Sequence, residues 1–217
     1  MTTLTFPVYD ADNHLYEPEE AFFRYLPKKF EDDFQFVDIK GKRKVLVGGR
    51  LSRYIPNPTF DVVAAPGAHE IWYRAKNFEG LTLREMSGVP MRPPVEWRTG
   101  EGRLQILDRQ GIHAAMLFPT LGTIIEERLD KPAAVAALFH SLNHWLDDEL
   151  GFARAGRLFS VPMISLSDLD LALAELDYAL KAGARAIWLR PAPVPGPRGS
   201  RSFGFPEFDT FWARCAE

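Results

Sequence analysis

The chain has 217 residues, of which 46% are hydrophobic and 25% charged, and its formal net charge is −3. This length and apolar content suffice to bury a core and exclude wholesale disorder, while the slightly negative charge argues against a general nucleic-acid or membrane-surface binder. A single cysteine, no visible signal peptide and no apolar run of roughly 20 residues together lead us to expect a soluble cytoplasmic protein without disulfides.

The first predicted element is a short buried strand over residues 6–10, which leads into the polar segment DADNH. Alternate side chains of an extended strand point to the same side, so Asp10, Asp12 and His14 are expected to form one polar row. Two carboxylates and an imidazole are costly to bury without a cation or hydrogen bonds. The row is therefore either a solvated strand end, with Asp10 bonded to backbone, or part of a metal site.

The next stretch, about residues 19–101, is predicted to be an insertion after the first strand. It begins with acidic residues that start a short helix, which Pro27 interrupts, and continues as a hairpin over residues 34–51. From Tyr54 onward, prolines and scattered aromatic residues replace any regular pattern, and a loop of this length is usually functional. Its aromatic residues include Phe60, Trp72, Tyr73, Phe78 and Trp97.

After this insertion, predicted helices and strands alternate. Gly111 and Gly183 are expected to end helices, and Ser167 or Asp168 to cap one. The strands are apolar runs rather than clean alternations, which is typical of a parallel sheet covered on both faces. The predicted helices span residues 103–112, about 131–155, 167–183 and 206–217, and the predicted strands span 113–120, 157–164 and 184–191.

With the first strand, this series amounts to four βα units, whereas eight units close a (β/α)8 barrel. The last predicted helix has no stop signal, and its apolar face, which includes Phe208 and Phe211, continues up to the end of the chain. Four further units would need about 150 more residues at the same spacing. We therefore expect an α/β chain that is the N-terminal half of a TIM barrel, with a complete small open α/β sheet as the alternative.

The segment YDADNH at residues 9–14 resembles the metal motif of the amidohydrolase-related family (amidohydrolase family 2). This family comprises metal-dependent hydrolases similar to aminocarboxymuconate-semialdehyde decarboxylase. Its usual first motif is His-x-His, or an acid-x-His variant, that follows a strand aspartate. The matching positions are Asp12 and His14, with Asp10 as the preceding aspartate.

Three later segments are similar to the family's second, third and fourth helix–strand units, so the resemblance spans nearly the whole chain. They are residues 107–120, 142–168 and 183–196. The family's remaining ligands, a histidine after a later strand and an aspartate after the last strand, have no counterpart before Glu217.

The resemblance implies that Asp12 and His14 ligate a divalent zinc or manganese ion at the carboxyl ends of the barrel strands. It implies a hydrolase acting on a small carbonyl or carboxylate compound, with the insertion as part of a substrate lid. A decarboxylase of an aromatic or semialdehyde acid is the alternative, because the deciding ligands and base lie beyond residue 217. A third possibility is an inactive half-barrel that pairs its open strand edges with another copy, and we expect a homo-oligomer.

Further residues are candidates for roles around the metal. Glu17, three residues after His14, either orients that histidine from behind or begins the following helix. Arg190, at the end of the fourth strand, either holds a substrate carboxylate or forms a structural ion pair. Thr120 and Met163 end the second and third strands, so their side chains are expected to line the pocket.

Two histidines, His140 and His144, lie four residues apart on a predicted helix, a spacing that permits metal binding. A zinc-protease helix has glutamate directly after its first histidine, where this chain has Ser141. A polar helix face is therefore favoured for this pair.

Overall fold

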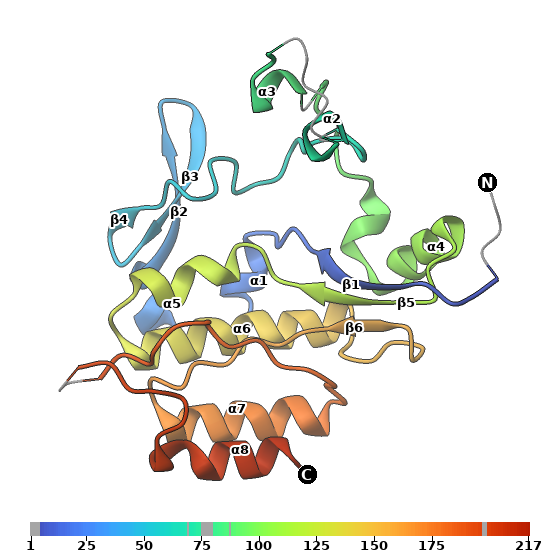
Figure 1. Cartoon of the computed structure of the whole chain (residues 1–217). Coiled ribbons are helices and arrows are strands. Elements are labelled where there is room, and N and C mark those ends of the chain that lie inside the picture. Colours follow the sequence, from blue (N-terminus) through green and yellow to red (C-terminus); the bar gives the residue numbers. More distant parts are fainter. Residues whose placement is uncertain (1–4, 69, 75–79, 87, 197–198) are drawn as a thin grey trace.

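Three parallel strands form the sheet beside which the candidate site lies: β1 (Tyr9–His14), β5 (Ala114–Phe118) and β6 (Leu158–Ser160), in the order β1-β5-β6 (Figure 1). The computed structural model describes residues 5–68, 70–74, 80–86, 88–196 and 199–217. The parallel sheet expected from the apolar strand patterns is confirmed. All three strands therefore end at the same edge of the sheet, where their following loops gather.

The fourth predicted strand, residues 184–191, is present only as one parallel bridge between Trp188 and Met163. Trp188 donates its N–H to the carbonyl of Pro162 at 2.8 Å, and Ile164 donates to the carbonyl of Trp188 at 3.0 Å. The carbonyl of Pro162 faces the Trp188 segment, and Pro162 has no N–H to add a second hydrogen bond on that side. The segment thus continues the order of the sheet without forming a full strand.

Helix α4 (Gly100–Gln110) begins earlier than the sequence pattern predicts, because Thr99 caps it by accepting the N–H of Gly102 at 3.1 Å. It ends at Gly111, whose φ of 68° is left-handed, as predicted. Helix α6 (Pro132–Glu149) ends before the left-handed Gly151, several residues short of the predicted end near Gly156.

Helix α7 (Leu169–Lys181) has the predicted cap, since the Asp168 carboxylate accepts the N–H of Leu171 at 3.1 Å. Helix α8 (Asp209–Cys215) follows a 3-10 turn, η4 (Pro206–Phe208). Figure 1 shows α6 along the sheet, with α7 and then α8 beyond it. No helix in the described part of the chain has both the length and the hydropathy that a membrane span requires.

The insertion after β1 contains the predicted hairpin, and Pro27 separates its first two helical turns. These elements are α1 (Glu20–Phe23), η1 (Lys28–Asp33), β2 (Phe34–Ile39), β3 (Lys42–Val47) and β4 (Arg50–Leu51). The hairpin strands are antiparallel and extend away from the main sheet (Figure 1). Among its described residues, the region expected to be irregular holds the short elements α2 (Glu70–Tyr73), α3 (Leu83–Met86) and η2 (Val95–Arg98).

Within the described part of the chain, two apolar clusters hold these layers together. The larger one joins the sheet to α6 and to the base of the hairpin, with Phe22, Phe34, Leu117 and Phe139 buried in it. The smaller cluster packs α7 and α8 against the strand segment 184–191 through residues such as Phe208. Because the sheet and the hairpin share the larger core, the first part of the insertion is packed next to the end of β1.

Candidate metal centre at the end of strand β1

The polar row predicted on β1 is interrupted by a bulge. Asp10 is paired with Ala115 and Asn13 with Leu117, so the register shifts between Asp10 and Asn13. The Asp10 carboxylate accepts the side-chain N–H of Asn13 at 2.8 Å and the backbone N–H of Asp12 at 3.1 Å. An extra residue in a strand breaks the two-residue period. Asp10 therefore braces the bulge, which contains Asp12, and the side chains of Asp12 and His14 come together at the end of the strand.

The Nε2 atom of His14 lies 3.3 Å from Oδ1 of Asp12. Two ligands that bind a tetrahedral zinc ion at about 2.0–2.2 Å are about 3.3–3.6 Å apart, so this pair fits neighbouring positions around one ion. The pair faces solvent, with 48% of the His14 side chain and 91% of the Asp12 side chain exposed. No third histidine, cysteine or acid joins them among the described residues. Two ligands alone are fewer than the three protein ligands that a catalytic zinc site usually has.

Glu17 is almost completely buried, and its carboxylate bonds neither to His14 directly nor to the start of α1. Its carboxylate accepts three backbone N–H groups in the loop after β5, from Thr120 at 2.8 Å, Leu121 at 3.0 Å and Gly122 at 2.9 Å. Burial raises the pKa of Glu17 to about 7, although the three N–H groups favour the ionised form. Glu17 is thus an anchor for the β5 loop, and α1 begins at Glu20 without a side-chain cap.

Thr120, predicted to line the pocket from its position at the end of a strand, is next to the candidate metal pair. Its Oγ1 atom lies 3.4 Å from Nδ1 of His14 and donates a hydrogen bond to the carbonyl of Leu15 at 2.7 Å. Glu17, Thr120 and His14 therefore form a continuous series of contacts from the buried loop to the strand end.

Arg103 is a site residue that sequence reasoning missed. Its guanidinium, on α4, is buried and donates to Asn13 Oδ1 at 2.9 Å, to the carbonyl of His14 at 3.2 Å and to the carbonyl of Trp97 at 2.8 Å. Burial lowers the pKa of Arg103 to about 10, so it stays charged at neutral pH. One arginine among the other charges of a helix gives no sign of burial, because most such residues are solvated.

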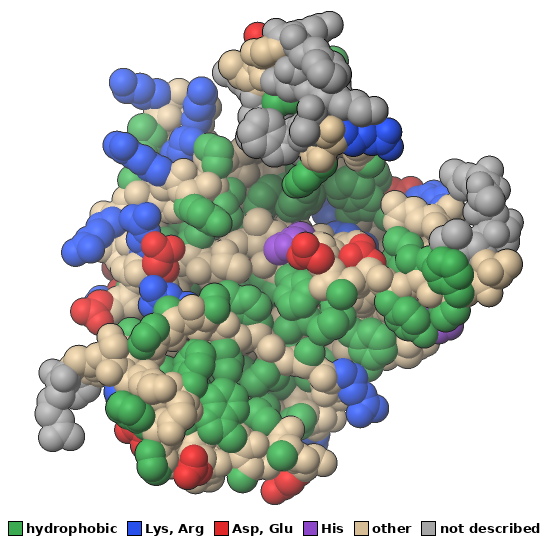
Figure 2. All heavy atoms as spheres, in the orientation of Figure 1, with side chains coloured by type: hydrophobic (Ala, Val, Ile, Leu, Met, Phe, Trp, Pro, Cys, Tyr) green, Lys and Arg blue, Asp and Glu red, His purple; other side chains and the backbone are tan. Residues whose placement is uncertain are grey.

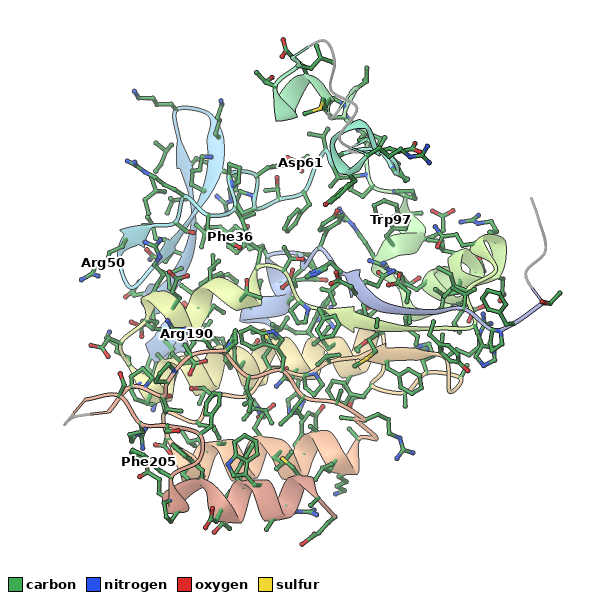
Figure 3. All side chains as sticks on the ribbon, viewed as in Figure 1. Phe36, Arg50, Asp61, Trp97, Arg190 and Phe205 are labelled. Carbon is green, nitrogen blue, oxygen red and sulfur yellow. The ribbon has the colours of Figure 1, made fainter. Side chains whose placement is uncertain are left out.

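Arg190 is half-buried and lies near Glu126, which belongs to α5 (Ile125–Arg128). Burial raises the pKa of Glu126, and the nearby charge of Arg190 opposes that shift. The Glu126 carboxylate accepts a hydrogen bond from the Ser165 hydroxyl at 2.6 Å. Within the described residues Arg190 has no acid within ion-pair distance, so the structural ion pair favoured from the sequence is not seen; Figure 3 labels Arg190 beside α5.

An aromatic pocket of about 170 Å³ adjoins the end of β1. Tyr16 stacks on Phe60 with ring centroids 4.5 Å apart and contacts Trp97 at 6.1 Å. Figure 3 labels Phe36 and Trp97, which line this pocket from the hairpin and from η2. Of the other insertion aromatics, Tyr73 is exposed, whereas Phe78 and the side chain of Trp72 fall outside the described residues.

A histidine and acidic side chains gather on the face shown in Figure 2, below apolar side chains of the insertion.

The histidine pair predicted on a helix, His140 and His144, lies on α6 and faces α7. His140 bonds to Glu175 at 2.8 Å, and the His144 ring stacks on Tyr178 at 4.0 Å. The polar helix face predicted for this pair agrees with these contacts.

No protein-family model matches this chain, and no curated protein matches it. The chain is similar to an amidohydrolase of known structure from Mycobacterium avium subsp. paratuberculosis, with 36% sequence identity and a TM-score of 0.91. This similarity covers 98% of the chain but only 57% of that protein, so the chain spans little more than half the length of this relative. A 2,6-dihydroxybenzoate decarboxylase from Rhizobium is 17% identical over 69% of this chain and 43% of its own, with a TM-score of 0.43.

Proposed function

We propose that this chain is the N-terminal part of a metal-dependent hydrolase of the amidohydrolase-related type, built on a (β/α)8 barrel. The 36% identity to an amidohydrolase across 98% of the chain supports the family. The parallel order β1-β5-β6, continued by the Met163–Trp188 bridge, suits consecutive strands of a barrel. The observation that carries the function is the Asp12–His14 pair at the carboxyl end of β1, the edge at which barrel enzymes bind their substrates.

In this proposal Asp12 and His14 hold a divalent zinc or manganese ion, with the remaining ligands from parts of the enzyme outside this chain. When bound, such an ion polarises a carbonyl group or lowers the pKa of a water molecule. Mixed carboxylate and imidazole donors suit both metals.

The other residues of the site hold the end of β1 in place and bind the substrate. Arg103 fixes the backbone of His14 and the side chain of Asn13, which keeps the candidate ligands in place. The aromatic pocket beside Tyr16 excludes water and binds the apolar part of a small carbonyl or carboxylate compound. Arg190 at the same edge of the sheet attracts a negatively charged substrate.

Calorimetric titration of the metal-stripped chain with zinc and with manganese tests the metal pair. We expect binding that Asp12→Asn and His14→Gln each weaken by at least about tenfold, because each removes one ligand. Asp130→Asn and His113→Gln, an exposed acid and a histidine at the opposite end of the strands, serve as controls and should bind like the parent. Equal affinity in all five proteins, or no binding by the parent, would refute the role of this pair.

The reaction class is decided separately, by the release of acid from test esters and lactones against the release of carbon dioxide from aromatic acids. We expect metal-dependent hydrolysis. Carbon dioxide release without hydrolysis would replace the hydrolase with a decarboxylase, and an inactive, metal-free oligomer would favour a non-enzymatic half-barrel.

A further inference from the structure

The hydroxyl group of Thr120 contacts two groups at the end of β1. Its Oγ1 atom is 2.7 Å from the carbonyl oxygen of Leu15 and 3.4 Å from Nδ1 of the His14 ring. A hydroxyl carries one proton and two lone pairs, whereas a carbonyl oxygen can only accept. The proton of Thr120 is therefore committed to Leu15, and only a lone pair of its oxygen faces the imidazole.

This arrangement favours one of the two nitrogens of His14 as the site of the proton. A neutral imidazole has one N–H and one bare nitrogen. If Nδ1 were bare, two lone pairs would face each other across the contact with Thr120. Protonation at Nδ1 turns that contact into a hydrogen bond and leaves Nε2 bare, facing the Asp12 carboxylate.

The position of Thr120 is itself fixed by hydrogen bonds on both sides of its peptide unit. Its N–H donates to the buried carboxylate of Glu17 at 2.8 Å, and its carbonyl accepts from the hydroxyl of Thr123 at 2.7 Å. The next two residues, Leu121 and Gly122, donate to the same carboxylate. The loop that carries the hydroxyl is thereby held at three consecutive residues by one side chain.

We propose that Thr120 is a positioning residue that keeps Nδ1 of His14 protonated and Nε2 bare, and that Glu17 anchors Thr120 in this place. The role of this tautomer in metal binding rests on the proposed function, because a metal ion binds only a nitrogen with a free lone pair, here Nε2 of His14. The opposite tautomer would donate from Nε2 to Asp12 at 3.3 Å, but that carboxylate is highly exposed and water competes for it. Thr120 is half-buried, so water has less access to its oxygen than to the Asp12 carboxylate.

The test is the ¹⁵N chemical shifts of His14 in the metal-free chain, at a pH above the range in which imidazoles titrate. We expect protonated Nδ1 in the parent chain and in Thr120→Ser, which keeps the hydroxyl. In Thr120→Val, which has the same shape without the hydroxyl, the proton should move to Nε2. Unchanged shifts of His140 and His144 would show that the variants are folded.

A proton on Nε2 in the parent, or a Thr120→Val spectrum like that of the parent, would overturn the role of Thr120. Glu17→Gln should shift the proton in the same direction as Thr120→Val, and an unchanged tautomer there would overturn the anchoring role of Glu17. Zinc titration adds a second measurement, in which Thr120→Val should weaken binding about 10- to 100-fold and Thr120→Ser should restore it. Since the tautomer is measured without metal, a chain that binds no zinc would refute the proposed function and leave the tautomer result to decide this inference.

Discussion

The guanidinium of Arg103 on α4 donates a 2.9 Å hydrogen bond to the side chain of Asn13 on β1, across 90 residues of sequence. The same guanidinium binds the carbonyl groups of His14 and Trp97. It therefore joins the candidate metal strand to the segment that carries one wall of the aromatic pocket. A buried cation that makes three hydrogen bonds is costly to remove, because each acceptor then loses its partner.

Arg103→Met keeps much of the side-chain volume but removes all three hydrogen bonds. We expect it to lower the free energy of unfolding by about 2–4 kcal/mol and to weaken zinc binding, because the end of β1 loses its support. Arg109→Met on the same helix is the matched control, since Arg109 is exposed and its loss should cost less than about 0.5 kcal/mol. Urea unfolding measures both, and equal stability of the two variants would contradict the clamp.

Glu17 should make the stability of the chain depend on pH. Its pKa is about 7 in the folded protein and 4.5 is its ordinary value, so the folded chain holds this proton more tightly. As pH rises from about 4.5 to 7 the unfolded chain releases the proton first, and stability falls by up to about 3 kcal/mol. The loss is complete above the folded pKa.

The difference in unfolding free energy between the parent and Glu17→Gln, measured by urea unfolding across this pH range, isolates that dependence. Glu31→Gln is the control, because Glu31 is an exposed acid on η1 and its replacement should leave the slope unchanged. If the difference in unfolding free energy between the parent and Glu17→Gln stayed constant with pH, the buried Glu17 carboxyl would not be the source of the pH dependence.

Gly102 is required where α4 approaches η2. A Cβ atom at this position would lie 2.4 Å from the carbonyl oxygen of Glu96 and 2.6 Å from its Cα, which are backbone atoms that cannot rotate away. Gly102→Ala should therefore separate η2 from α4 and destabilise the chain by about 2–4 kcal/mol. Gly204→Ala, where the new Cβ has only an ordinary contact at 3.8 Å, should leave the melting temperature nearly unchanged. Similar melting temperatures for both variants would contradict the close approach.

His140 and His144 should have opposite effects on acid stability. The bond to Glu175 raises the pKa of His140, so its contribution is present below the ordinary pKa of 6.5 and is lost as pH rises through the folded value. Burial, and then the charge of His140, lower the pKa of His144, so its contribution is present above 6.5 and is lost as pH falls.

Melting temperatures between about pH 5 and 8 test this pair. His140→Gln should lower the melting temperature mainly at acidic pH, whereas His144→Gln should relieve part of the acid destabilisation. If both variants lowered, or both raised, the melting temperature at acidic pH, the pKa values of His140 and His144 would not be shifted in opposite directions.

Much of the architecture was predictable because it depends on local pattern. The apolar runs identified β5 and β6 as parallel strands, Gly111 and Asp168 marked helix ends, and the alternating segment over residues 34–51 formed the hairpin. The error at the end of α6 arose because Gly151 stops the helix before the predicted Gly156. Short-range steric and capping preferences act within a few residues, so they are visible in the sequence.

The sequence by itself determined which residues form the candidate metal pair, since Asp12 and His14 are two positions apart in the acid-x-His motif. Only the tertiary structure decided what surrounds them. The bulge redirects Asp10, Arg103 reaches the strand from a distant helix, and Glu17 binds the loop after β5. These partners are set by which backbone groups each buried charge finds when the chain packs, because a buried charge must be hydrogen-bonded wherever its partners lie in the sequence.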